Sequence, residues 1–243
     1  GGTRVQDLPA FEAGLFEVQD EGSQIAAWLA GAAPGMKVVD YCAGGGGKTL
    51  ALAQALMSGQ GAAGGHLYAF DTDQRRLDAV TPRLDRAGAR AELRKIGEHG
   101  EGTGDLRQAA DLVLVDAPCT GSGTWRRRPE QAWRLDEAEL ARFAALQGSI
   151  LTDASALVKP GGRLAYVTCS VLAAENLAVT DAFATSHPQF ASVPVATAAA
   201  TPGLTDLGRT RLTDLAGGGH RVQMSPLRTG TDGFFIALFE RTK

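Results

Sequence analysis

The sequence contains few of the residues that mark several common classes of protein. Its 243 residues include three cysteines and four histidines, which are scattered and form no CxxC pair. This set provides no disulfide framework, fits a reducing cytoplasm and argues against a zinc site, so we expect a cytoplasmic protein without a metal. The apolar runs are far shorter than a membrane span, so we expect no membrane partner.

A large excess of charge of one sign is also missing. The formal net charge is -3 at pH 7. This balance argues against a protein held on nucleic acid by bulk charge alone, but it leaves room for a local basic patch. The stretch "WRRRPE", residues 125–130, provides such a patch. From composition alone, three arginines on a loop are more typical of a solvated surface than of a binding site.

Apolar residues are plentiful, and their number limits how many domains the chain can form. They make up 44% of the chain, which is enough for a sizeable core in one large domain or two small ones. We expect a leading segment over residues 1–19 and a single domain over 20–243, and we favour a monomer. Gly1 stands where a methionine would be expected, which indicates a fragment of a longer protein.

Apolar periodicity alternates between strand and helix along the chain. Alternation of this kind is typical of βαβ units, so we expect an α/β fold with a parallel sheet. Pro82 interrupts one helical pattern and should kink it or begin a new turn. The expected strands are 36–42, 66–71, 91–96, 111–118, 163–170, 190–195 and 232–240; the expected helices are 20–30, 48–57, 74–87, 140–158, ended by "KPGG", and 173–188; residues 201–219 are expected to form a loop.

The first strand leads into "DYCAGGGGKT", residues 40–49, which resembles a phosphate-binding loop. That motif needs a glycine six positions before its lysine, and the residue there is Cys42. A glycine turn followed by an acidic second-strand end, Asp71, instead indicates an adenosine-type cofactor. Because GxGxxG is absent, S-adenosylmethionine is favoured over NAD.

Two cysteines end strands that should be neighbours in the sheet. Cys119 follows the fourth strand in "DAPC", three residues after Asp116, and Cys169 lies in "TCS" at the end of the fifth. Each alone would usually be a small buried apolar residue. Ligands bind beyond the carboxyl ends of parallel strands, so two thiols and a carboxylate there indicate a reactive site.

These motifs carry a family resemblance. "DYCAGGGGKT", "YAFDTDQRRL", "DLVLVDAPCTGSGTWRRRPEQAW", "LAYVTCSVLAAEN" and "DGFFIALFE" occur in the order seen in the Sun/Fmu-like (Nop/Sun) family of RNA cytosine-5 methyltransferases. The chain is most similar to bacterial members that act on small-subunit ribosomal RNA. The resemblance implies a Rossmann-like class I methyltransferase fold, with seven mostly parallel strands, helices on both faces and an antiparallel last strand. Members of this bacterial type also carry an N-terminal helical RNA-binding domain, which is not evident here.

The resemblance also implies roles for individual residues. Cys169 is expected to be the nucleophile, Cys119 to release the product and Asp116 to bind the cytosine edge. Arg126, Arg127 and Arg128 lie where the family has an arginine pair and close to Cys119, so we expect them to contact RNA phosphates. Apart from the resemblance, we expect Trp133 to pack against a helix. The residues expected to bind S-adenosylmethionine are Cys42, Ala43, Gly44, Gly45, Gly46, Gly47, Lys48, Asp71, Glu98 and Asp116.

Two positions of the expected cofactor site depart from the family pattern. Gly45 stands where the family usually has proline, and Glu98 is the nearest match to an aspartate that meets adenine. Because of these two departures the sequence does not determine the affinity for S-adenosylmethionine. They also support an alternative interpretation of the chain as a non-catalytic RNA-binding module. A DNA cytosine-5 methyltransferase is a second alternative, which the additional "TCS" cysteine disfavours. A small-molecule methyltransferase would not need two thiols at strand ends.

Overall fold

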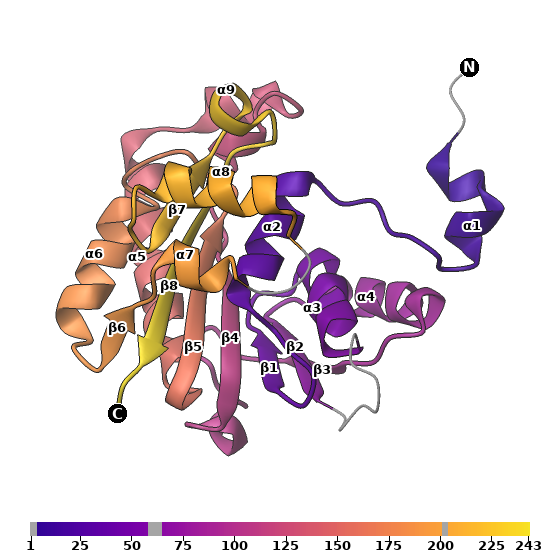
Figure 1. Ribbon diagram of the computed structural model, residues 1–243, viewed down its shortest axis with the longest axis horizontal. Coiled ribbons are helices and arrows are strands. Elements are labelled where there is room, and N and C mark those ends of the chain that lie inside the picture. The colour runs from indigo at the N-terminus through magenta and orange to yellow at the C-terminus, as the bar shows by residue number, and fades with distance from the viewer. Residues whose placement is uncertain (1–3, 58–64, 201–203) are drawn as a thin grey trace.

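A computed structural model describes residues 4–57, 65–200 and 204–243. The described residues form one sheet of eight strands in the order β3-β2-β1-β4-β5-β8-β6, with β7 also paired to β8 (Figure 1). β1 to β5 are parallel, whereas β8 is antiparallel to β5. The strands are β1 (Lys37–Asp40), β2 (His66–Asp71), β3 (Glu92–Lys95), β4 (Ala110–Asp116), β5 (Val158–Thr168), β6 (Phe190–Ser192), β7 (Arg221–Met224) and β8 (Phe234–Arg241).

The predicted α/β class, the mostly parallel sheet and the antiparallel last strand are confirmed. The eighth strand is new: β6 and β7 share one edge of β8, β6 at its carboxyl end and β7 at its amino end. The α-helices of the described residues are α1 (Pro9–Glu12), α2 (Glu21–Ala30), α3 (Gly47–Met57), α4 (Gln74–Ala87), α5 (Glu137–Ser155), α6 (Leu177–Ser186), α7 (Val195–Ala198), α8 (Asp206–Ala216) and α9 (Pro226–Thr229). α4 runs unbroken through Pro82.

Helices cover both faces of the sheet because successive residues of each buried strand point to opposite sides. One core packs α2, α3, α7 and α8 against residues such as Val38 and Leu114. The other packs α5 and α6 against residues such as Val39 and Val115. The extended run after α1 stands apart from the sheet, near α4 (Figure 1), and Glu17 ties it to Arg83 and Arg86 of α4. This architecture gathers the carboxyl ends of the parallel strands at one edge.

Two expectations about element boundaries are wrong. The long helix ends at Ser155, and the apolar pattern continues beyond it because Val158 is fully buried as the first residue of β5. Residues 159–162, "KPGG", lie inside β5 as an irregularity between its pairs with Ala110 and Leu112, rather than ending the helix. The expected strand 190–195 is also shorter, because Val195 begins α7.

The expected loop over 201–219 is wrong for most of its length. Residues 201–203 lie outside the described residues, but α8 occupies 206–216. The helix forms despite its Gly and Thr content because both ends are capped. The Thr205 side chain accepts a hydrogen bond from the Gly208 N–H, and Gly217 adopts the left-handed conformation at the end. Leu212 is buried against the core, which stabilises the helix further.

Candidate active site

The glycine turn between β1 and α3 is held against the end of β2. The N–H of Gly44 donates to Asp71 Oδ2 at 2.9 Å, and the N–H of Asp73 donates to Asp71 Oδ1 at 2.8 Å. Gly46 has φ +80°, and a Cβ there would lie 2.8 Å from the Val80 side chain, so this turn requires glycine at that position. The structure therefore brings together the predicted turn and the predicted acidic residue.

Asp40, the last residue of β1, is fully buried beside this turn. Its Oδ2 accepts a hydrogen bond from Thr49 Oγ1 at 2.7 Å, and its Oδ1 has no hydrogen-bond partner within the part of the chain that the structure describes. Burial raises the pKa of Asp40 to about 7. The Thr49 hydrogen bond and Lys48 act to lower this pKa, whereas Asp116 and Asp71 act to raise it. The carboxyl group of Asp40 therefore ionises near neutral pH rather than near pH 4.

Lys48 and Asp116 form an ion pair at the sheet edge. Lys48, in the first turn of α3, places Nζ 2.8 Å from Asp116 Oδ2 at the end of β4. The lysine side chain is 6% exposed and the aspartate side chain 33% exposed, so the pair is buried on one side and open to a ligand on the other. The Nζ also lies 5.0 Å from the centre of the Phe234 ring, within the range of a cation–π contact.

The two predicted cysteines lie side by side, because β4 and β5 are adjacent strands. Cys119 Sγ and Cys169 Sγ are 3.4 Å apart. The hydrogen bond from the Cys119 thiol lowers the pKa of Cys169, and Lys48 acts in the same direction, against burial and Asp116. The same hydrogen bond and burial hold the pKa of Cys119 well above its ordinary value. Of the two thiols, that of Cys169 is therefore the one that ionises more readily, with the Cys119 thiol in contact.

Cys169 opens into a cavity of about 290 Å³. The cavity walls combine a thiol, a carboxylate, three cations and an aromatic ring, a mixture that suits a polar, planar ligand. The lining residues are Lys48, Asp116, Thr124, Arg127, Arg128, Cys169 and Phe234. A larger cavity of about 1260 Å³ lies between the N-terminal segment, α2, α3 and α8, and it contains none of the predicted site residues.

The arginine run, residues 126–128, borders the smaller cavity, and only some of its charge is paired with carboxylates of the chain. Arg126 Nη2 lies 3.4 Å from Asp232 Oδ1, and Arg127 pairs with the other oxygen of the same fully buried carboxylate. Their side chains are nevertheless 68% and 56% exposed, and Arg128 lines the cavity directly. The expectation that Trp133 packs against a helix is wrong: it is 88% exposed, after the same run.

Several residues of the site were missed in the sequence. Residues 173–176 were expected to begin a helix, but α6 starts at Leu177, and the preceding turn buries Glu175 and Asn176 completely. Glu175 bonds to the loop that follows β4, and Asn176 Nδ2 donates to the carbonyl of Ser170 at 2.9 Å. The motif "AAEN" gave no periodic signal of this role, since the loop that Glu175 holds is distant in the sequence.

The loops after β4 and β5 also meet the start of β8 through close backbone contact. The N–H of Gly123 donates to the carbonyl of Cys169, and the N–H of Gly233 donates to the carbonyl of Gly123, both at 2.9 Å. A Cβ on Gly123 would lie 2.1 Å from the Gly233 carbonyl oxygen. The atoms that a Cβ on Gly123 would meet belong to the backbone of Gly233, so they could move aside only if the loops that carry the site moved with them.

We therefore expect Gly123→Ala to lower the free energy of unfolding by about 3 kcal/mol, measured by urea denaturation. Gly148→Ala is the matched control, because Gly148 lies inside α5 and a Cβ there would meet nothing within 4 Å. That variant should be as stable as the wild type or slightly more stable. Equal stability of Gly123→Ala and the wild type would show that the backbone contact is not tight.

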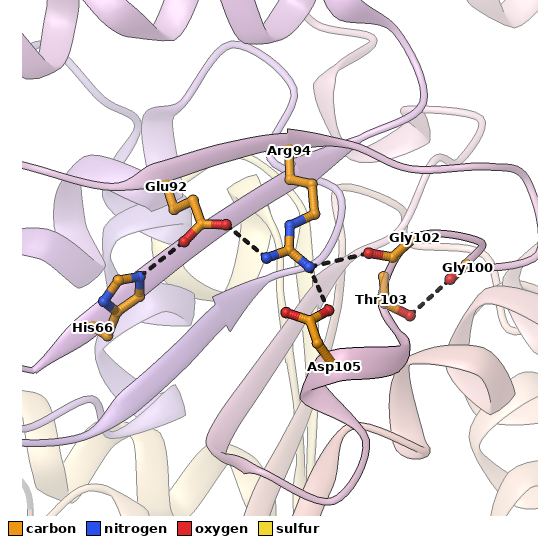
Figure 2. Close-up of polar contacts among 7 residues, drawn as sticks. All are labelled: His66, Glu92, Arg94, Gly100, Gly102, Thr103 and Asp105. Carbon is orange, nitrogen blue, oxygen red and sulfur yellow. Dashed lines mark hydrogen bonds and ion pairs between the residues drawn. The ribbon is translucent and has the colours of Figure 1, made fainter.

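Glu98 lies in a loop after β3, and its side chain is exposed. Arg94 organises the surroundings: its guanidinium donates to Asp105, to the Gly102 carbonyl and to Glu92 (Figure 2). Glu92 also contacts His66 at 3.2 Å. Figure 2 therefore shows a polar network that fixes the loop, and the assignment of Glu98 to adenine stays a prediction.

The edge of the sheet has the features that S-adenosylmethionine requires. Asp71 offers carboxylate oxygens of the kind that accept hydrogen bonds from ribose hydroxyls, and its side chain is 6% exposed. The backbone at Gly44 is open, because a Cβ there would meet nothing within 4 Å. Asp116 lies at the same edge, where its carboxylate is paired with Lys48. Within residues 4–57, 65–200 and 204–243, no helix is long and apolar enough to cross a membrane and no cluster of acidic, His or Cys side chains could hold a metal.

Comparison with known proteins agrees with this geometry. Residues 26–240 match the family model described as 16S rRNA methyltransferase RsmB/F. The chain is 34% identical over 241 residues to the ribosomal RNA small subunit methyltransferase B of Erwinia tasmaniensis, covering 96% of this chain and 48% of that protein. The chain thus spans about half the length of this curated relative.

Two solved structures extend the comparison. The crystal structure of PH0851 superposes with a TM-score of 0.85 at 34% identity, over 99% of this chain and 50% of that one. The structure of NSun6 from Pyrococcus horikoshii with SFG has a TM-score of 0.78 at 24% identity, over 99% of this chain and 57% of that one. The expected family resemblance and methyltransferase fold are confirmed, and the family match supports S-adenosylmethionine as the methyl donor.

Proposed function

Because the chain belongs to the RsmB/F family of 16S rRNA methyltransferases, we propose that it methylates carbon 5 of a cytosine in RNA, with small-subunit ribosomal RNA as its substrate class. The observation that carries the proposal is the 3.4 Å separation of Cys119 Sγ and Cys169 Sγ at the ends of adjacent strands. One thiol is sufficient for nucleophilic attack, so a second thiol in contact with the first supports a two-cysteine mechanism.

The lowered pKa of Cys169 suits the first step. Carbon 5 of cytosine is a poor nucleophile until a thiolate adds at carbon 6 and turns the ring into an enamine. The Cys169 thiolate forms that bond, and Asp116 hydrogen-bonds the base edge. Bound S-adenosylmethionine supplies the electrophilic methyl group that carbon 5 then attacks.

The second step removes the carbon-5 proton and expels Cys169. Once Cys169 is bonded to carbon, it has no negative charge, so its hydrogen bond and charge no longer raise the pKa of Cys119, and burial is the main remaining cause. Cys119 can then release its proton to solvent, and its thiolate takes the proton from carbon 5. The electrons of that C–H bond re-form the ring double bond as the bond from carbon 6 to the Cys169 sulfur breaks.

Arg126, Arg127 and Arg128 are proposed to contact the phosphates around the target nucleotide. A cytosine must leave its stack to reach a cavity, which favours a single-stranded or loop site in RNA. Free thiols in the site fit a cytoplasmic protein.

The proposal is tested by identifying the product. We expect incubation with small-subunit ribosomal RNA and S-adenosylmethionine carrying a deuterated methyl group to yield labelled 5-methylcytidine in nucleoside mass spectrometry. RNA incubated without the protein is the control. Label in another nucleoside, or no label together with no binding of S-adenosylmethionine in calorimetry, would contradict the proposal.

A further inference from the structure

The side chain of Glu175 connects the two cysteine loops. It is fully buried and accepts four hydrogen bonds: from Thr120 N at 2.8 Å, Thr120 Oγ1 at 2.6 Å, Ser170 Oγ at 2.5 Å and Gln147 Nε2 at 2.9 Å. Thr120 follows Cys119, and Ser170 follows Cys169. A buried carboxylate is costly unless donors satisfy it, so these four contacts form a unit.

The loop that carries Cys119 is anchored through this unit. It has no regular secondary structure at residues 117–121. Thr120 bonds to Glu175 through both its N–H and its hydroxyl, and the Pro118 carbonyl accepts from Gln147 Nε2 at 2.9 Å. That same amide nitrogen bonds to Glu175. The residues on both sides of Cys119 are therefore held directly or indirectly by one carboxylate.

Cys169 has anchors that do not involve Glu175. The preceding residue, Thr168, is paired with Phe235 of β8. The carbonyl of Ser170 accepts from Asn176 Nδ2 at 2.9 Å and from Gln223 Nε2, on β7, at 3.2 Å. Loss of the Glu175 charge should consequently loosen the loop of Cys119 while Cys169 stays in place.

From this unequal anchoring we propose that Glu175 is a positioning residue that holds Cys119 in contact with Cys169 and thereby controls product release rather than methyl transfer. The chemical roles of the two sulfurs rest on the proposed function; the positioning of one sulfur by Glu175 rests on the geometry alone.

The first test separates the two steps in RNA. Glu175→Gln keeps the side-chain size but replaces one accepting oxygen by a donor, which opposes the donors that now face it. We expect methyl transfer in a single turnover to fall by no more than about threefold, because Cys169 keeps its place but loses part of the hydrogen bond that lowers its pKa. The fraction of protein covalently attached to RNA should rise about tenfold, since small displacements strongly slow proton transfer. A merely structural role would instead lower both steps and the unfolding temperature together, without attached RNA.

The second test needs no RNA. Diamide, an azo oxidant, takes two electrons and two protons from a pair of thiols, which joins the sulfurs as a disulfide and leaves the hydrazine. In the wild type, with sulfurs 3.4 Å apart, peptide mass mapping should find rapid pairing of Cys119 with Cys169. We expect Glu175→Gln to slow this pairing about tenfold.

Thr120→Val is the second variant, for the case in which Glu175→Gln does not fold. It removes only the hydroxyl donor to Glu175, and Thr120→Ser, which keeps that donor, is its matched control. Slower pairing in the valine variant but not in the serine variant supports the positioning role. Pairing at the wild-type rate in Glu175→Gln and Thr120→Val overturns it. If the wild-type protein pairs its thiols but methylates no RNA, the proposed function is contradicted, whereas the positioning role of Glu175 is not.

Discussion

The Cys119→Ala protein is expected to remain covalently attached to its RNA, whereas Cys169→Ala is expected to form no attachment. Without the Cys119 thiol the carbon-5 proton has no acceptor in contact with Cys169, so the adduct persists after methyl transfer. Without the Cys169 thiolate no bond to carbon 6 forms, and methylation should fall by at least about a thousandfold, the scale seen when a covalent nucleophile is removed.

Denaturing gel electrophoresis of protein mixed with labelled RNA and S-adenosylmethionine reads out this difference. The double variant Cys119→Ala/Cys169→Ala is the control, and it should show no slow-migrating band. The reverse pattern, with attachment in Cys169→Ala alone, would contradict the assignment and favour the DNA-type mechanism, in which the cysteine after proline is the nucleophile.

The free energy of unfolding of Asp40→Asn is expected to increase relative to that of the wild type as the pH rises from 4 to 8. In the unfolded chain an aspartate ionises near pH 4, whereas burial raises the pKa of Asp40 to about 7 in the folded protein. Between these values the folded state holds a proton that the unfolded state has released, so folding stability contributed by this group is present below pH 4 and lost as the pH rises through 7. Asparagine does not ionise and avoids that loss.

The difference in unfolding free energy between variant and wild type should therefore change by about 4 kcal/mol across this range, measured by urea denaturation in steps of one pH unit. Asp111→Asn is the control. Although burial acts to raise the pKa of Asp111, hydrogen bonds from Lys159 and from the Lys37 N–H hold it below its ordinary value. Its contribution is present above pH 4 and is lost only as the pH falls below that value, so the difference between its variant and the wild type should stay nearly constant from pH 4 to 8. A pH-independent difference for Asp40→Asn would mean that its pKa is not raised.

Sequence alone was sufficient for most of the strands, the parallel arrangement and the meeting of the two cysteines. Strand periodicity and flanking turns are local signals, and the rule that ligands meet the carboxyl ends of parallel strands predicted that Asp71, Asp116, Cys119 and Cys169 share one edge of the sheet. These residues could be placed together because each directly follows, or ends, a strand whose position in the sheet is set by apolar pattern and topology.

Only the tertiary structure decided which residues hold that site in place. The turn at Glu175 was mistaken for helix, α8 was mistaken for loop, and the contact of Gly123 with Gly233 has no local signature. The helix depends on the capping residues Thr205 and Gly217 and on a buried face, which compensate for weak propensity. The turn at Glu175 depends in part on Thr120, 55 residues away, and Gly123 meets a residue in a different part of the chain. A local pattern carries no information about which distant donor or backbone it will meet. In this protein the reactive groups follow from short motifs, whereas their separation and support follow from long-range hydrogen bonds and packing.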